Sequence, residues 1–340
     1  MGGVVYCLEG SFRIWRLHSL VQCTNQGYVP ITATGINTSE VVKVDAQRFT
    51  SKSLMINGWP LFWWLTVFAA VFMIRASLLN NLSTPEGISA MIQYSVRWAV
   101  PLIFLITATS AMARLFPNTI TRWLMRNRRY VGLAFAAAMA WQGVFIFWIS
   151  VGHPDHYYTN IYFLRDELEG SSGYLFLTAM IVTSFPFGRR YLTAANWTVL
   201  HRAGVYFLWA YPFSVYWWNI AYYGSSLWLD YLFYGLGFTA FALRIAAWGK
   251  GRWASQKATG GYASAGKVLI LAGLLLAVTG SWWQEPISGL LLASAPSQTL
   301  ELWLPFWPFQ PFLPLGVLGL GTWLLTIKSS PALPETQVAA

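Results

Sequence analysis

The sequence predicts an all-α integral membrane protein, a polytopic helix bundle that crosses the bilayer about eight times. Composition is the first observation behind this prediction. Of the 340 residues, 56% are hydrophobic and only 10% are charged, against about 25% charged in ordinary soluble domains. The second observation is a series of apolar segments of membrane-spanning length. The third is the placement of arginine and lysine, which concentrate in alternate connections between those segments.

Eight apolar segments approach the roughly 20 residues that a helix needs to cross the hydrocarbon core. Lipid offers no hydrogen-bond partner to the backbone, so each segment is predicted to be helical. In chain order the segments are Trp59–Ile74, Trp98–Met112, Tyr130–Val151, Tyr174–Phe187, Val199–Tyr222, Leu227–Trp248, Val268–Trp283 and Phe312–Ile327.

The distribution of positive charge predicts the orientation, because Lys and Arg stay on the cytoplasmic side. Three connections hold most of the positive charge: Arg114, Arg122, Arg126, Arg128 and Arg129; Arg189, Arg190 and Arg202; and Lys250, Arg252, Lys257 and Lys267. The intervening connections are mostly acidic or neutral, with Asp155, Asp166, Glu167, Glu169, Asp230, Glu285 and Glu301. The first external connection is the exception, with Arg75 and Arg97 against Glu86. The balance predicts that both termini are cytoplasmic.

The net charge of +10 is explained by these connections, and its natural counterpart is an anionic inner leaflet rather than nucleic acid. The 20 tryptophans and 17 tyrosines are typical of the aromatic belts at the two membrane interfaces. The sequence therefore predicts a multi-pass protein of the cell membrane, which in a bacterium is the inner membrane. Its principal partner is the lipid bilayer.

Residues 1–54 differ in composition from the remainder of the chain. They lack a positively charged start followed by a short apolar core, so they do not resemble a secretory signal. They are either a disordered extension or sequence that precedes a true translation start at Met55. Cys7 and Cys23, the only cysteines, lie here, which leaves no disulfide framework or thiolate site elsewhere. Residues 55–265 are predicted to form the core of the bundle, and residues 266–340 two additional helices and a short tail.

His201 is the only histidine inside a predicted membrane helix. Two haems can stack across a bilayer when ligands on one helix are 13 or 14 residues apart, about 20 Å along the axis and on nearly the same face. Ser214 holds that position after His201, and Gln142 holds the facing position on the third segment. The position facing His201 itself is Arg128 or Arg129, and a guanidinium has no lone pair with which to bind iron.

Two motifs resemble the ferric reductase-like transmembrane family: R-R-x-x-G-L-x-F over residues 128–135 and W-x-x-L-H-R-x-x-x-Y over residues 197–206. The resemblance covers segments two to six and is strongest in pattern to haem-bearing membrane subunits of bacterial methionine sulfoxide reductase systems. It implies a six-helix core that passes electrons across the membrane through haem b, with ligands on the third and fifth helices. His201 matches a ligand position, whereas Gln142 and Ser214 stand where the family places histidine. Neither an amide nor a hydroxyl is a usual axial ligand.

Two functions are consistent with this pattern, and catalytic residues are assigned in neither. The first is a haem-free membrane scaffold or partner subunit, in which His201 bonds a neighbouring group and Gln142 joins helices across the bundle. The alternative is transmembrane electron transfer through a residual haem b ligated by His201. The sequence shows no flavin or nicotinamide module. A redox role would therefore need a separate partner, another membrane protein or a periplasmic redox protein.

Three external segments complete the predictions. His153 and His156 could contribute to a metal site, but two imidazoles alone are incomplete and a structural loop is expected. Residues 165–169 are expected to form a solvated connection or to dock a periplasmic partner. Residues 305–314 contain four prolines and cannot form a regular helix, so they are expected to lie along the outer interface.

Overall fold

The computed structural model describes residues 56–224, 227–253, 261–293, 296, 298–299 and 306–327, all within one compact unit of residues 53–340. Throughout these residues the ordered elements are helices and no strand occurs, which confirms the all-α prediction. The elements are α2 (Trp59–Leu79), α3 (Pro85–Leu115), α4 (Thr119–Gly152), α5 (Pro154–Asn160), α6 (Leu164–Thr183), α7 (Pro186–Arg189), α8 (Ala194–Ala221), α9 (Trp228–Trp253), α10 (Gly261–Val278), α11 (Gly280–Leu292), the 3-10 turn η1 (Gln310–Phe312) and α13 (Leu313–Leu324). The predictions for residues 1–54 and the two cysteines lie outside the described residues.

Four of the described helices, α2, α3, α4 and α9, are long and apolar enough to cross a membrane. The pair α10 and α11 passes the same test when taken together, but its two helices meet at 97°. The predicted segment Val268–Trp283 is therefore wrong as one straight helix, because the chain turns at Thr279. The segment Tyr174–Phe187 is also interrupted, since α6 ends at Thr183 and Pro186 begins the short α7.

Helix starts follow local capping chemistry. Asn118 and Thr121 form a reciprocal capping box at the start of α4, in which each side chain accepts the backbone N–H of the other. The side chain of Thr193 accepts from the Asn196 N–H and caps α8 in the same manner. These caps set where α4 and α8 begin, and therefore the depth at which their arginine and histidine side chains lie.

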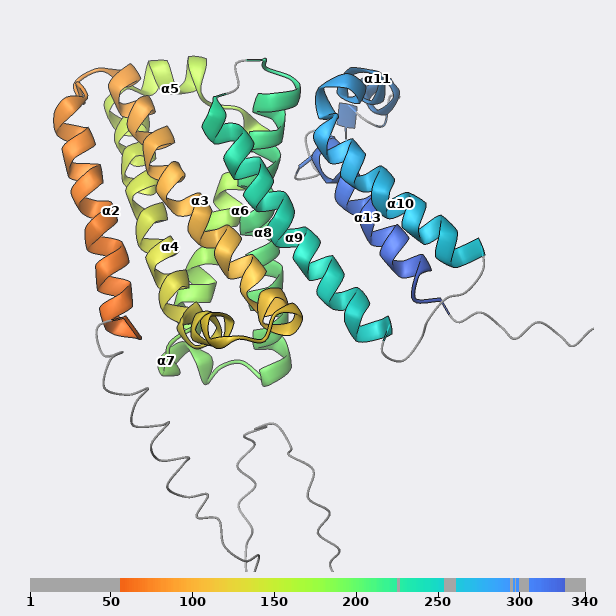
Figure 1. Ribbon diagram of the computed structural model, residues 1–340. Helices are drawn as coiled ribbons and strands as arrows, with labels where there is room; N and C mark the ends of the chain where they lie inside the picture. The colour runs from red at the N-terminus through yellow and green to blue at the C-terminus, as the bar shows by residue number, and fades with distance from the viewer. Residues whose placement is uncertain are drawn as a thin grey trace, which may run out of the picture. The chain divides into compact units, whose positions relative to one another are not determined.

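The core lies where α3 packs against α4 and α9, and where α8 packs against α6 and α9 (Figure 1). One close approach within it is at Gly237 of α9. A Cβ there would lie 2.8 Å from Phe104 and 3.0 Å from Phe213, and Trp209 Nε1 donates to the Gly237 carbonyl at 2.9 Å. The missing side chain is what allows three aromatic rings to meet this helix.

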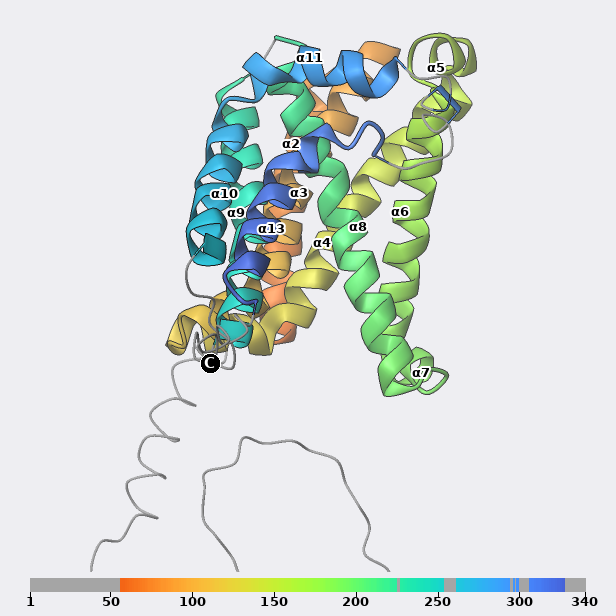
Figure 2. The same cartoon turned by 90° about the vertical axis from the view of Figure 1, so that its right-hand side faces the viewer.

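Helices α10 and α13 lie side by side in both views (Figures 1 and 2) and pack on each other and, through α13, on α9. Their backbones approach closely, since a Cβ on Gly321 would lie 2.7 Å from the Gly266 carbonyl oxygen. Small residues permit this kind of helix contact. Gly321 of α13 therefore packs closely against α10.

Two of the three segments predicted to be external differ from the predictions. Residues 165–169 are not a connecting loop, because they form the first turns of α6; Asp166, Glu167 and Leu168 are exposed as predicted, whereas Glu169 is buried. In the proline-aromatic run, residues 306–309 are irregular as predicted, but Gln310–Phe312 forms a 3-10 turn and Pro314 lies in the first turn of α13. A proline in the first turn of a helix is tolerated because its missing N–H would have no partner there.

Candidate functional site

Two cavities lie one above the other between α4 and the α6–α8 pair. The first, of about 880 Å³, is at the end of the bundle near α7 and contains five arginines; we call it the arginine cavity. The second, of about 340 Å³, is near the start of α6 and contains Asp166, Glu167 and Glu169; we call it the acidic cavity. Four apolar residues line both of them: Ile103, Phe135, Leu177 and Leu208. The two cavities thus share an apolar wall, with arginines lining one cavity and carboxylates lining the other.

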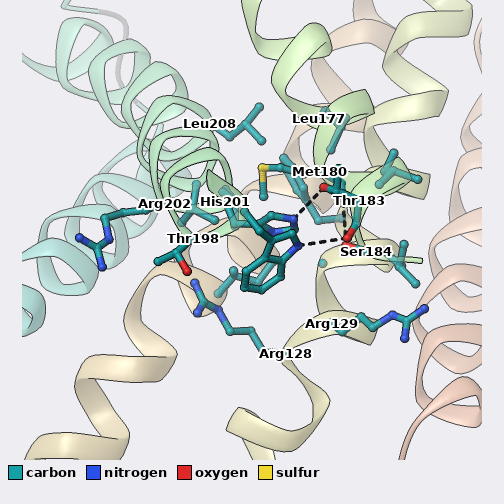
Figure 3. A pocket seen from close by; sticks show the side chains of 18 of the residues that line it. Arg128, Arg129, Leu177, Met180, Thr183, Ser184, Thr198, His201, Arg202 and Leu208 are labelled. Carbon is teal, nitrogen blue, oxygen red and sulfur yellow. Dashed lines mark hydrogen bonds between the residues drawn. The ribbon is translucent and has the colours of Figure 1, made fainter. Parts of the chain in front are cut away.

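His201 lines the arginine cavity from the second turn of α8 and is half-buried. Its Nε2 lies 3.0 Å from the Thr183 hydroxyl and its ring lies on Trp197 at 4.1 Å between centroids. The Trp197 Nε1 donates to the Thr183 carbonyl at 3.0 Å, so both rings are held by one residue of α6 (Figure 3).

This arrangement indicates the tautomer of His201. The Thr183 hydroxyl donates its single proton to the Ala179 carbonyl at 2.7 Å, so toward His201 it can only accept. We therefore assign the proton to Nε2 of the imidazole, which donates to Thr183. In this tautomer Nε2 has no lone pair with which to bind a metal, whereas Nδ1 keeps one.

Two guanidinium groups lie near His201, those of Arg128 and Arg189. Arg128 of α4 points into the cavity below His201, whereas Arg129 and Arg202 point away on opposite sides (Figure 3). Arg189 lies over the Trp197 ring, with Cζ 4.5 Å from its centroid.

Arg244 lies deeper along the bundle and is firmly held. Its Nε and Nη2 donate to the Tyr206 hydroxyl at 3.0 and 2.6 Å, and its Nη1 donates to the Thr107 carbonyl at 3.0 Å. It therefore links α9 to α8 and α3 while its charge lines the cavity. We call Arg128, Arg189 and Arg244 the arginine set.

The arginine set lacks carboxylate partners. No Asp or Glu occurs among the described residues that line the arginine cavity. Within the ranges that the structure covers, Arg128 makes no hydrogen bond or ion pair, and Arg189 Nη1 is buried without a hydrogen-bond partner. Unpaired charge in such a place is costly, so the arrangement has the character of an anion site.

In the acidic cavity, the side chain of Gln142 is hydrogen-bonded to another helix of the bundle. Its Oε1 accepts from the Tyr174 hydroxyl at 3.2 Å, which joins α4 to α6 as the sequence predicts for a membrane-buried amide. On the rim, the Tyr157 hydroxyl donates to Glu167 at 2.9 Å. Burial, together with this bond to Glu167, raises the pKa of Tyr157 to about 12.

Ser214 does not line either cavity, contrary to the predicted register. It is buried and its hydroxyl donates to the Tyr211 carbonyl at 2.8 Å. The expectation that a spacing of 13 places both residues on nearly the same face was wrong, because 13 residues at about 100° each leave Ser214 roughly 140° around the helix from His201. Tyr211 and Pro212 line the acidic cavity in its place.

The side chains present do not fit a haem held by two histidines. His201 commits its Nε2 to Thr183, Arg128 lies across the cavity from it, and the second level offers Gln142. No group of three His, Cys, Asp or Glu side chains that could hold a metal occurs in the described part of the chain. His156 belongs to no such group, and its Nδ1 lies 3.4 Å from the Asn160 amide.

The sequence analysis missed Arg244, Tyr206 and Thr183. Arg244 could have been identified from the sequence, because an arginine well inside an apolar segment costs free energy and is often functional. Tyr206 was part of the quoted motif, but its partner lies 38 positions away and could not be identified from spacing. The role of Thr183 depends on α6 packing beside α8, which no local pattern reveals.

Comparison with known proteins adds no relative. No family model matches the chain, and neither a curated protein nor a solved structure matches it.

Proposed function

We propose that this chain is a haem-free membrane subunit that keeps the architecture of the ferric reductase-like electron carriers it resembles and acts as a scaffold or partner for another protein. One observation carries the proposal: among the described residues that line the two cavities His201 is the only histidine, its Nε2 lies 3.0 Å from the Thr183 hydroxyl, and Arg128 lies across the cavity from it. A haem held by two histidines needs an imidazole on each side of the iron, whereas here the facing group is a guanidinium, which has no lone pair, and Nε2 of His201 is already hydrogen-bonded. The partner would be another membrane protein or a periplasmic redox protein.

We further propose that the chain crosses the membrane about eight times, with both termini cytoplasmic. Beside the four long apolar helices and the bent α10–α11 pair, the helices α6, α8 and α13 would complete the count. The arginine cavity would then open to the cytoplasm by the positive-inside rule. The test is labelling with a membrane-impermeant maleimide in intact cells, after Cys7 and Cys23 are changed to Ser. Tyr158→Cys should react and Arg122→Cys should not; the reverse pattern would invert the orientation.

The absorption spectrum of the purified chain tests the absence of haem. The expected result is a colourless protein without a Soret band, reduced or oxidised, and a second chain that co-purifies with it. A b-type spectrum with two histidine ligands would contradict the proposal outright. His201→Ala is the matched variant, since its spectrum should equal that of the unchanged chain.

Electron transfer through a single haem b ligated by His201 is the second candidate. The observation that favours it is the volume of the arginine cavity beside His201, together with the thioethers of Met125 and Met180 in its lining. Methionine is an established axial ligand. This candidate predicts a Soret band that disappears in His201→Ala, so the same measurement separates the two functions.

A further inference from the structure

We propose that the arginine cavity binds an anionic phospholipid, with the headgroup phosphate held by the arginine set and an acyl chain along the apolar wall. The proposal rests on the absence of haem from this cavity, which the absorption spectrum tests independently. Three features of the cavity carry it: unpaired positive charge, an apolar interior, and an opening at the end of the bundle where lipid headgroups lie.

The charge requires an anion. Arg128 and Arg189 flank His201, and neither guanidinium has a carboxylate among the described lining residues. Arg244 adds a third positive charge whose geometry is already set by Tyr206 and the Thr107 carbonyl. A phosphate oxyanion can accept from several guanidinium N–H groups at once, which is the strongest kind of hydrogen bond in proteins. Basic pockets between membrane helices on the cytoplasmic side are typical sites for anionic headgroups.

The apolar interior of the arginine cavity requires that the bound anion also carry an apolar tail. Beyond the arginine set, the wall is formed by aliphatic and aromatic side chains, and it ends at the four residues shared with the acidic cavity. At about 880 Å³ the cavity is within the range of sites that enclose whole organic ligands, roughly 300–1,000 Å³. A free phosphate would leave most of this apolar surface without contact. An amphiphile satisfies the charge and the wall together.

The opening admits a lipid from the bilayer. Helix α4 and the α6–α8 pair diverge toward the α7 end (Figure 2), where the cavity is found. Its rim consists of exposed residues: Met125, Arg129, Pro186, Thr198 and Arg202. A phospholipid could therefore enter sideways with its headgroup at the level of the arginines.

The experiment compares two double variants of the full chain that lose the same charge. The cavity variant is Arg128→Gln with Arg189→Gln. The control is Arg122→Gln with Arg190→Gln, since both of these arginines are exposed and bond only local groups, the Asn118 carbonyl and the Tyr191 hydroxyl. Each protein is purified in neutral detergent and titrated with phosphatidylglycerol, and bound lipid is counted by native mass spectrometry. Phosphatidylcholine and inorganic phosphate are the other two titrants.

The expected result is one tightly bound phosphatidylglycerol on the unchanged chain and on the control, and binding weaker by at least about tenfold on the cavity variant, because each of its two substitutions removes a charge-assisted contact. Equal phosphatidylglycerol binding by cavity variant and control would overturn the proposal, as would equal binding of phosphatidylcholine. If inorganic phosphate displaced the lipid and raised the melting temperature as much, the site would be one for a free anion and the lipid assignment would be wrong.

A second variant covers the case in which the cavity variant does not fold. Gly132 lines the arginine cavity, and a Cβ there would meet only Ile106 Cδ1, at 4.0 Å. Gly132→Leu keeps every arginine and fills the cavity with a side chain that the helix accommodates well. It should lose the bound phosphatidylglycerol while its melting temperature in detergent is maintained. Retention of the lipid by this variant would also refute the proposal.

Discussion

The backbone N–H of Phe306 donates to the buried carboxyl group of Glu169 at 2.6 Å, although the two residues are 137 positions apart. Phe306 has φ of 62°, a backbone conformation that is unfavourable for a large side chain. Beside it, Arg165 Nη1 donates to the Trp307 carbonyl at 3.1 Å. The first turns of α6 therefore hold the irregular segment that leads into α13.

Glu169→Ala should destabilise the protein by about 1–3 kcal/mol, the usual cost of leaving a buried N–H unsatisfied. Glu169→Gln is the matched variant, because its amide oxygen can still accept from Phe306 and it buries no charge. We expect Glu169→Gln to melt at or above the temperature of the unchanged chain. Thermal unfolding in detergent measures both; equal losses in the two variants would show that the hydrogen bond does not stabilise this segment.

The helical character of the chain could be predicted because it depends on local sequence. Most residues of each of the eight apolar segments lie on helix in the described structure, although Tyr174–Phe187 and Val268–Trp283 are interrupted, since apolar runs of this length must satisfy their own backbone hydrogen bonds. The turn at Thr279 could not be predicted in this way, because the residues on both sides of it are apolar. Gly280 packs against the indole of Trp217, where a Cβ would lie 3.1 Å from Nε1, and a hydropathy window does not register such a contact.

The candidate site was predicted only in part, for a similar reason. Arg128 and Gln142 are 14 positions apart on α4 and both line the cavities, as helical periodicity predicts. The prediction for Ser214 was wrong because a spacing of 13 residues places its side chain on a different face of α8 from that of His201. The engagement of His201 by Thr183 depends on how α6 packs against α8, and tertiary packing of this kind is not encoded in any one segment.

Gly237→Ala should destabilise the core by about 1–3 kcal/mol, the range found for overpacking. The added methyl group would lie 2.8 Å from the Phe104 ring and 3.0 Å from the Phe213 ring, and both rings are buried. Gly235→Ala on the same helix is the control, since its Cβ would meet no atom within 4 Å. Alanine there should be neutral or stabilise by up to about 1 kcal/mol through helix propensity. If both variants melted alike, close packing at Gly237 would not limit stability.

Ionisation of the Tyr157 hydroxyl should lower the free energy of unfolding in strongly alkaline solution. Its pKa is raised to about 12, chiefly by burial and then by its bond to Glu167, from an ordinary value near 10. A group whose pKa is higher in the folded state contributes stability that is complete below about pH 10 and is lost as the pH rises toward 12. Tyr157→Phe should therefore lose less stability than the unchanged chain between pH 10 and 12. Tyr158→Phe, which removes an exposed hydroxyl, is the control and should follow the unchanged chain.

Tyr206→Phe should destabilise the bundle by about 1–3 kcal/mol, because Arg244 would lose the acceptor of two of its hydrogen bonds. The phenylalanine ring would remain, so the contact of the guanidinium with the aromatic face, 4.7 Å from Cζ to the centroid, would be preserved. The loss of stability would then measure the contribution of the Tyr206 hydroxyl alone. Tyr222→Phe at the other end of α8 is exposed and serves as the control in the same thermal unfolding measurement. Equal melting temperatures for the two variants would mean that the Thr107 carbonyl suffices to hold Arg244, and that α8 does not depend on this arginine for its position.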